Sequence, residues 1–288
     1  MPHLNFDGKT NYCVISDLHG QGKLYDLLIN NFDKEGIKKK ITLIINGDII
    51  DRGPESIRMI VDIMERSKKK KGNFDIVMLP GNHEQMMYSA LKYLYENGSW
   101  KNNDIWFLPD NHGYDTAVEF GKLSSEKQKE LYEFLGSLPL YCTIKSKEND
   151  GTSYAIVHAA PPSNAMISSD IPTLKEIVSK PEYKNLIQCL TYRENDDNSM
   201  GEISLPNKDV VTVIGHTPVE TDTGFMLKEN GKLLMIDGGC SYMAQNPNSK
   251  IFPEMATLVN LSEDRSKVRI VPYGSDGQKD LRMAAKSR

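Results

Sequence analysis

The chain has 288 residues, of which 39% are hydrophobic, so it can bury a sizeable core in one or two domains. Its net charge of −4 gives no support for a basic surface that binds nucleic acid. No stretch approaches the roughly 18 apolar residues that a membrane-spanning helix needs.

Two further features indicate the compartment. Residues 1–10 contain neither a basic region nor an apolar core of a secretory signal, so we expect a cytoplasmic protein. The cysteines are widely spaced and form no Cys-x-x-Cys pair, which predicts free thiols in a reducing compartment. They are Cys13, Cys142, Cys189 and Cys240.

The first half of the chain alternates strand and helix patterns. Apolar runs at 11–16, 41–46 and 75–79 predict strands, and 41–46 lacks period-two alternation, which favours a strand buried on both faces. Apolar residues at helical spacing follow each run. The three sets are Leu24, Leu27, Leu28 and Phe32; Ile57, Ile60, Val61 and Met64; and Met86, Met87, Ala90, Leu91 and Leu94. Pro54 suits the first residue of the second helix, and Gly98 ends the third, which starts near Glu84. This order predicts an α/β layout.

The second half is richer in strands. After a helix that begins at Ser124 or Ser125 and buries Leu131, Phe134 and Leu135, we expect strands at 138–145, 153–159, 210–215, 225–229, 232–237, 256–261 and 267–272. Asn230-Gly231 predicts a hairpin, and the last two strands are expected at a sheet edge. The polar segments 98–116 and 161–209 are predicted to be irregular loops.

The motifs that carry chemistry extend from Asp17 to His216. One site therefore draws on nearly the whole chain, which predicts a single domain over residues 1–274. Residues 275–288 are polar, and we expect them to form a flexible tail.

Five short patterns place metal-binding and phosphate-binding residues directly after apolar runs. They are Asp17-Leu18-His19-Gly20, Gly47-Asp48-Ile49-Ile50-Asp51-Arg52-Gly53, Gly81-Asn82-His83-Glu84, the single His158, and Gly215-His216-Thr217. Asp, Asn and His suit a pair of borderline metal ions, and Arg suits a phosphate oxygen. The patterns together predict a hydrolase of phosphate esters.

A dinuclear site needs a bridging carboxylate and further ligands for each ion. Asp17 and His19 are two residues apart, so both side chains can face one ion, and Asp48 is the natural bridge. The second ion is then completed by Asn82, His158 and His216. Each histidine alone is more simply a structural residue, but four of the six histidines fall in these patterns, which favours the metal site.

The remaining polar residues of the patterns suit catalysis. His83 is placed to protonate the leaving group, and Asp51 to orient its imidazole. Arg52 and Arg193 can hold phosphate oxygens, although for Arg193 a solvated side chain is an almost equally good interpretation. For Glu84 we expect a supporting hydrogen bond, and for Asp237 a structural turn.

The set of motifs resembles the phosphoprotein phosphatase branch of the calcineurin-like metallophosphoesterases, over residues 10–240. The compact phage and bacterial members, such as bacteriophage lambda phosphatase, are the most similar by motif. The resemblance implies a four-layer αββα sandwich, with two mixed β-sheets flanked by helices and a dinuclear site at the strand ends. It implies the same ligands and catalytic residues, and two divalent ions: manganese first, with iron or zinc as alternatives. Ser16 stands where the family usually has Gly.

The resemblance implies hydrolysis of phosphoserine or phosphothreonine in proteins, with phosphotyrosine as a further option, by direct attack of a metal-bound hydroxide. The expected partner is thus a phosphorylated protein or peptide, with no nucleic acid and no membrane, and the oligomeric state stays open. The alternative is a symmetrical dinucleoside tetraphosphate (Ap4A) hydrolase, because Pro54 after Arg-Gly resembles the sequence of that group. Asp51 and Glu84 instead favour the protein phosphatases. Phosphodiesterases and nucleases of the superfamily usually carry a histidine at the position of Pro218, which argues against those activities. The complete set of expected ligands argues against a non-catalytic binding protein.

Overall fold

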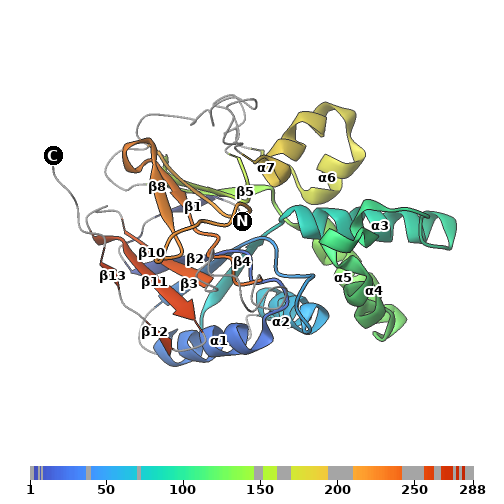
Figure 1. The fold of residues 1–288 in the computed structure, drawn as a ribbon, viewed down its shortest axis with the longest axis horizontal. Helices are drawn as coiled ribbons and strands as arrows, with labels where there is room; N and C mark the ends of the chain where they lie inside the picture. The colour runs from blue at the N-terminus through green and yellow to red at the C-terminus, as the bar shows by residue number, and fades with distance from the viewer. Residues whose placement is uncertain are drawn as a thin grey trace.

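The computed structural model describes residues 3–5, 7, 9–36, 40–69, 73–145, 152–160, 170–193, 210–241, 256–262, 267–274, 277–278 and 281–282. Two β-sheets lie face to face, and helices cover them (Figure 1). This is the α/β sandwich of two mixed sheets that the motif resemblance implies. Within the described residues, no helix combines the length and the apolar character needed to cross a bilayer.

The first sheet has seven strands. Its order is β12 (Gly277–Gln278), β11 (Arg269–Gly274), β10 (Ala256–Leu261), β2 (Thr10–Ile15), β3 (Lys40–Asn46) and β4 (Asp75–Leu79), and β13 (Leu281–Arg282) also pairs with β11. Strands β2, β3 and β4 are parallel, and β10 is antiparallel to both β2 and β11. The expectation that 256–261 forms an edge strand is therefore wrong, because β10 has a neighbour on either side.

The second sheet has six strands. Its order is β1 (His3–Asn5), β5 (Tyr141–Lys145), β6 (Thr152–Val157), β7 (Val211–Ile214), β9 (Leu233–Met235) and β8 (Met226–Lys228). Strands β6, β7 and β9 are parallel, whereas β8 and β9 form the antiparallel hairpin predicted from Asn230-Gly231. Asn230 has the left-handed backbone (φ 53°) that this turn requires.

The helices carry the following bounds. They are α1 (Gly22–Gly36), α2 (Ser56–Lys69), α3 (Asn82–Asn97), α4 (Gly113–Gly121), α5 (Ser125–Ser137), α6 (Leu174–Ser179) and α7 (Gln188–Thr191), with the short 3-10 helices η1 (Ile105–Phe107), η2 (Pro109–Asn111), η4 (Pro181–Ile187) and η5 (Glu229–Gly231). Helices α1 and α2 lie along the outer side of the seven-stranded sheet, and α3, α4 and α5 extend to one end of the sandwich (Figure 1).

The core follows from the side-chain alternation of the central strands. On β3, Ile44 belongs to the apolar cluster between the two sheets, whereas Leu43 and Ile45 belong to the cluster shared with the helices. On β2, Val14 faces the other sheet and Ile15 the helices in the same way. A strand buried on both faces, as predicted for 41–46, is therefore confirmed.

Two helix predictions need correction. Leu27 is 41% exposed, because the buried stripe of α1 instead runs through Tyr25, Leu28, Ile29 and Phe32. Helix α2 starts at Ser56, two residues after Pro54. The helices near Glu84 and Ser124 form as predicted, and Gly98 ends α3 with φ 75°.

The two segments predicted to be irregular contain helices. Residues 98–116 hold η1, η2 and the start of α4, and the described part of 161–209 holds α6, η4 and α7. In the second segment, Thr173 and Glu176 form a capping box: Thr173 Oγ1 accepts the Glu176 N–H, and Glu176 Oε2 accepts the Thr173 N–H at 2.9 Å. This sequence signal predicts a helix start.

Candidate metal centre

The motif residues lie where parallel strands of both sheets end. Strands β2, β3 and β4 end at Ile15, Asn46 and Leu79, with at most one residue before each of the first three motifs. Strands β6 and β7 end at Val157 and Ile214, directly before His158 and His216. Because parallel strands place their carboxyl ends at one edge, each sheet contributes one row of polar residues.

Hydrogen bonds join the two rows. The Asn46 side chain donates to the Val157 carbonyl at 2.9 Å, and His158 Nδ1 contacts the Asn46 carbonyl at 2.9 Å. The backbone N–H of His216 donates to both carboxylate oxygens of Asp17, each at 3.1 Å. The structure thus brings residues about 200 positions apart in the sequence into one buried cluster.

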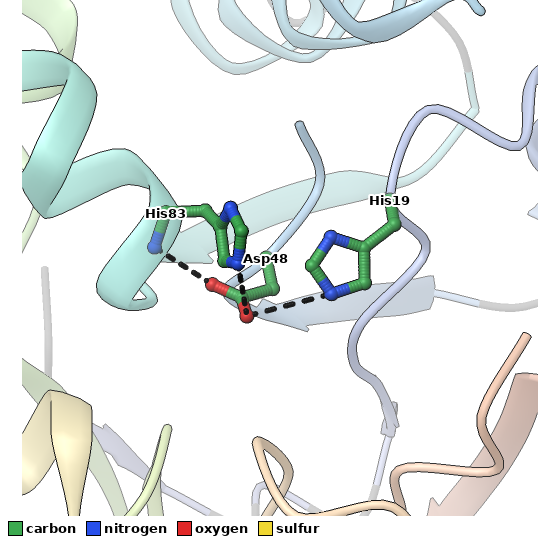
Figure 2. Close-up of side chains that lie close together, drawn as sticks. All are labelled: His19, Asp48 and His83. Atoms are coloured by element: carbon green, nitrogen blue, oxygen red, sulfur yellow. Dashed lines mark hydrogen bonds and ion pairs between the residues drawn. The ribbon is translucent and has the colours of Figure 1, made fainter. Parts of the chain in front are cut away.

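Asp48 lies at the centre of this cluster. Its Oδ2 atom is 3.6 Å from His19 Nε2, 3.4 Å from His158 Nε2 and 4.0 Å from His83 Nε2. Figure 2 shows the carboxylate between the imidazoles of His19 and His83. Two groups of three potential ligand atoms share it, one with His19 and His83 and the other with His158 and His216. A carboxylate shared by two groups is the arrangement expected of a metal bridge.

Hydrogen bonds also orient two of the imidazoles. His19 Nδ1 faces the Ile50 carbonyl and His158 Nδ1 the Asn46 carbonyl, each at 2.9 Å. Because a carbonyl only accepts, Nδ1 carries a proton in both rings, and Nε2 is the ring nitrogen that lies toward Asp48. This is the supporting arrangement common to metal-ligating histidines.

Asn82 and His216 lie beside the second group. Asn82 Oδ1 is 3.3 Å from His158 Nε2. His216 is 5% exposed, and neither of its buried ring nitrogens has a hydrogen-bond partner among the described residues. Burial lowers the pKa of His216 to about 2, and the positive charges of His158 and Arg193 act in the same direction. A buried, neutral imidazole with free nitrogens is suited to a metal ion.

Asp17 is in the cluster but belongs to neither group of three. Its carboxylate accepts hydrogen bonds from the Ser16 hydroxyl and the His216 backbone. Burial raises the pKa of Asp17 well above its usual value, and the neighbouring Asp237 carboxylate adds to this rise. The role of Asp17 as a ligand stays a prediction.

Asp237 was expected to form a structural turn, and its Oδ1 atom does accept the Gly239 N–H at 2.9 Å. Its carboxyl group is also 4% exposed, and burial raises its pKa to about 6. Two buried carboxyl groups beside one another, at Asp17 and Asp237, are stabilised as anions by a nearby cation. The position of Asp237 directly after the apolar run 233–236 was the signal that its carboxyl group lies at the cluster.

His83 and Asp51 form a buried pair next to the shared carboxylate. His83 Nδ1 is 2.7 Å from Asp51 Oδ2, and both side chains are at most 1% exposed. The Nε2 atom of His83 therefore points toward Asp48. Sequence reasoning missed a third member: Trp106 Nε1 donates to the same Asp51 oxygen at 2.9 Å. A tryptophan in a segment predicted to be polar and irregular was the available signal.

Two arginines lie near histidines of the cluster. Arg52 Nη1 is 3.0 Å from His19 Nε2 and 3.4 Å from the Ser241 hydroxyl. Burial lowers the pKa of His19, and the Arg52 charge lowers it further. The Arg193 side chain is exposed, as the alternative of a solvated arginine predicted, but it is close enough for its charge to act on His216.

The Glu84 carboxylate fixes the backbone around the candidate ligands through hydrogen bonds. Glu84 Oε2 accepts the N–H groups of Asp48 at 2.8 Å and Gly81 at 2.7 Å, and its Oε1 accepts that of Ile49 at 2.9 Å. Burial raises the pKa of Glu84 and these hydrogen bonds oppose the rise. The supporting role predicted for Glu84 is confirmed.

Two motif glycines allow close approach of the backbone. A Cβ atom on Gly81 would lie 2.1 Å from Asp48 Oδ1, and one on Gly215 would lie 2.1 Å from Asp17 Oδ2. Any side chain at either position would displace a carboxylate of the cluster. Six motif residues other than glycine have positive φ values between 43° and 70°. They are Asp17, His19, Asp48, Asp51, Arg52 and His216. Such conformations are concentrated at functional sites.

The donor set fits two divalent ions. A carboxylate is shared by two groups of candidate ligands, imidazole Nε2 atoms lie toward it, and His216 has two buried nitrogens without partners among the described residues. Burial alone would lower the pKa of His158, but the Asp48 carboxylate raises it to about 10, so positive charge is favoured beside Asp48. Mixed nitrogen and oxygen ligands suit manganese, iron and zinc alike.

The four cysteines are free thiols, as predicted, and all four are buried. Cys240 lies closest to the cluster, where its thiol donates to the Asp17 carbonyl at 2.8 Å. Burial raises its pKa well above the usual value of a thiol. Cys240 is thus held as a neutral thiol and supports the backbone of Asp17.

Comparison with known proteins agrees with this geometry. An asymmetrical bis(5'-nucleosyl)-tetraphosphatase, PrpE of Bacillus subtilis, is 26% identical over 90% of this chain and 98% of its own length. Serine/threonine-protein phosphatase 2 of Escherichia coli is 31% identical over 51% of this chain and 56% of its own length. A Saccharomyces cerevisiae protein serine/threonine phosphatase shares the fold, with a TM-score of 0.58 at 16% identity over 100% of this chain and 85% of that one.

A family description covers most of the chain. Residues 10–254, which include every motif discussed above, match the calcineurin-like phosphoesterases. With the two-sheet fold and the shared-carboxylate cluster in place, the chain belongs to the calcineurin-like phosphoesterase family.

Proposed function

We propose that this metallophosphoesterase is a phosphoprotein phosphatase, which removes phosphate monoesters from serine, threonine or tyrosine side chains. The observation that carries the proposal is the arrangement around Asp48: the His83–Asp51 pair lies on one side, and the charges of Arg52 and Arg193 act on histidines of the same cluster. An acid and two guanidinium groups around a metal-binding carboxylate suit a phosphoryl group and its leaving oxygen.

The ligand residues of the proposed site are Asp17, His19, Asp48, Asn82, His158 and His216. When bound there, two divalent ions neutralise phosphate charge and supply an acidified water as the nucleophile. His83 then gives a proton to the leaving oxygen from Nε2, because its Nδ1 is bonded to Asp51. We propose manganese as the physiological metal, with iron and zinc as alternatives.

A phosphate monoester presents three terminal oxygens and two negative charges at pH 7. Arg52 offers forked N–H groups next to the His19 Nε2 atom, and its Nε is buried without a partner among the described residues. Arg193 is exposed and free to approach from solvent. Two cations and two guanidinium groups match such a dianion better than a singly charged internal phosphate.

Two further segments also support a protein phosphatase, because they resemble the compact phage and bacterial enzymes such as bacteriophage lambda phosphatase. They are Glu84-Gln85-Met86-Met87 and Gly215-His216-Thr217-Pro218.

A second candidate is hydrolysis of dinucleoside tetraphosphates. One specific observation favours it: the Bacillus subtilis relative named for this activity matches 90% of the chain, whereas the Escherichia coli protein phosphatase matches about half. The name of that relative specifies asymmetrical cleavage of the tetraphosphate. The second candidate function is therefore asymmetrical cleavage, in place of the symmetrical cleavage expected from the sequence.

One experiment separates the candidates. Purified protein, reconstituted in turn with Mn²⁺, Fe²⁺ and Zn²⁺, is given phosphoserine, phosphothreonine and phosphotyrosine peptides and, in parallel, diadenosine tetraphosphate. The proposal predicts higher kcat/KM for a phosphopeptide. Release of ATP and AMP at the higher kcat/KM would instead establish asymmetrical tetraphosphatase activity, and two ADP would indicate symmetrical cleavage. Asp48→Asn is the control for contaminating hydrolases.

A further inference from the structure

We propose that Trp106 is a positioning residue for the catalytic acid: its indole N–H holds the Asp51 carboxylate in the one orientation that aligns His83 with the leaving oxygen. The proposal rests on the proposed function in one respect, the role of His83 as the acid. It does not depend on which phosphate ester is the natural substrate.

The hydrogen bonds at Asp51 carry the inference. Asp51 Oδ2 accepts both from His83 Nδ1 at 2.7 Å and from Trp106 Nε1 at 2.9 Å. The other oxygen, Oδ1, is buried and has no hydrogen-bond partner among the described residues. Both donors thus select the same carboxylate oxygen, and Trp106 is the one whose N–H takes no part in proton transfer. Without the Trp106 N–H, the Asp51 carboxylate can rotate, and the His83 imidazole is no longer held in one orientation.

The indole is held in place independently of any substrate. Trp106 is 0% exposed and lies in η1, where the Asp104 side chain accepts its backbone N–H at 3.0 Å. Its ring lies 5.2 Å from that of Phe107 and 6.1 Å from that of Trp100, measured between centroids. A Cβ atom on Gly113 would lie 2.3 Å from the Trp106 carbonyl oxygen and 2.5 Å from Trp106 Nε1, so that glycine makes room for both the backbone and the indole of Trp106.

The step that depends on this alignment is proton transfer to the leaving group. A water oxygen forms a bond to phosphorus while the bond from phosphorus to the leaving oxygen breaks, and that oxygen takes the proton from His83 Nε2. One proton of the water stays on the released phosphate, and the other returns to the imidazole through solvent. The need for this proton is greatest when the leaving group is a poor one.

The test compares two substrates that differ in their leaving groups. Trp106→Phe keeps an aromatic ring but removes the N–H. We expect kcat for phenyl phosphate, whose leaving group is poor, to fall by about 10- to 100-fold, as for loss of a hydrogen bond to a charged group. For p-nitrophenyl phosphate, whose leaving group departs without a proton, we expect a fall of less than about 3-fold. KM and the content of bound manganese should stay unchanged.

The matched control is Trp100→Phe, which changes the same residue type in the same aromatic cluster but away from the Asp51 oxygen. It should leave both rates near wild type. Gly113→Ala is a second variant, because the added methyl group displaces an intact Trp106; it should reproduce the leaving-group dependence of Trp106→Phe. Thermal unfolding of each variant shows that it is folded.

Equal losses with both substrates, or equal rates to wild type with both, would overturn the proposal, since a merely structural tryptophan does not sense the leaving group. Failure of the proposed function is a different result: the wild-type, metal-loaded protein would then hydrolyse neither aryl phosphate nor phosphopeptide. A leaving-group effect in Trp106→Phe supports the inference even if tetraphosphate proves to be the better substrate.

Discussion

The Glu84 carboxylate is bonded to the backbone N–H of Asp48 through its Oε2 atom at 2.8 Å. The same carboxylate also accepts N–H groups from Ile49 and Gly81, so one side chain fixes two of the motif turns. Glu84→Gln replaces an acceptor with an amide that can turn a donor toward these N–H groups. We expect metal affinity to fall by about 10- to 100-fold, as for other residues that support metal ligands.

Metal titration followed by calorimetry tests this expectation. Glu96→Gln is the matched control, because Glu96 is an exposed residue of the same helix and pairs only with Lys92 among the described residues. Unchanged metal affinity in Glu84→Gln would show that the turns keep their shape without this carboxylate.

Asp48 is shared by both groups of candidate ligands, so its loss should affect both proposed ions together. For Asp48→Asn we expect metal affinity to fall by at least about 100-fold and turnover of p-nitrophenyl phosphate to be lost in parallel. Elemental analysis and the rate are measured on the same sample. Asp110→Asn, in the exposed helix η2, serves as the control. Normal metal content and a normal rate in Asp48→Asn would remove this residue from the site.

His83 offers a sharper test, because its Nε2 atom is close enough to Asp48 to be counted as a potential ligand. If it is the acid, His83→Asn should retain both metals while kcat falls by about 10²- to 10⁴-fold. Elemental analysis and steady-state kinetics distinguish the roles. Loss of half of the bound metal would instead place His83 among the ligands.

Arg52 is expected to bind the substrate phosphate through its fork of N–H groups. Arg52→Lys keeps the charge but removes the fork, so we expect KM for p-nitrophenyl phosphate to rise by about 10-fold and inhibition by inorganic phosphate to weaken equally. Arg58→Lys is the control, because Arg58 is a partly exposed residue of α2 that pairs with Asp26. An unchanged KM and inhibition constant would leave Arg52 with only its bonds to His19 and Ser241.

Tyr25 gives a prediction about stability that is independent of the metal site. Its hydroxyl donates to Asp62 Oδ2 at 2.8 Å and joins α1 to α2. Burial raises the pKa of Tyr25 far above its usual value, and the Asp62 charge adds to the rise. A raised pKa means that the neutral form is favoured in the folded state, so this stability is present below about pH 10 and is lost as the pH rises further.

Tyr25→Phe should therefore lower the free energy of unfolding by roughly 1–2 kcal/mol at pH 7. The substitution should also reduce the amount by which the free energy of unfolding falls as the pH rises above 10. Urea denaturation at several pH values measures both effects. Tyr93→Phe, at a partly exposed tyrosine of α3, is the control. A variant as stable as wild type across this range would contradict the assigned bond.

Much of the fold could be predicted from local pattern. The parallel strands β2, β3 and β4 were visible because apolar runs of β-branched residues alternate with helical spacing. The residues of the metal cluster were visible because polar motifs follow those runs. Whether Ile44 faces the other sheet or a helix could not be read from the sequence, since both environments are apolar and the alternation of burial disappears.

The role of Trp106 could not be predicted either. The bond between Trp106 and Asp51 joins residues 55 positions apart, and nothing in the polar segment around Trp106 marks its partner. The position of β10 inside the sheet could not be predicted for the same reason, because strand order depends on pairing between residues far apart in the sequence. Thr173-x-x-Glu176, in contrast, was a local helix signal within reach of sequence reasoning.

The positive φ angles of the motif residues have a consequence for how the site should be dissected. Asparagine is the residue that tolerates left-handed backbone best after glycine, and aspartate is similar. Alanine at Asp17, Asp48 or Asp51 would therefore pay a conformational penalty in addition to losing its carboxylate, and a deficit in turnover would mix the two causes. Asparagine scanning of these turns isolates the chemistry from the geometry of the peptide chain.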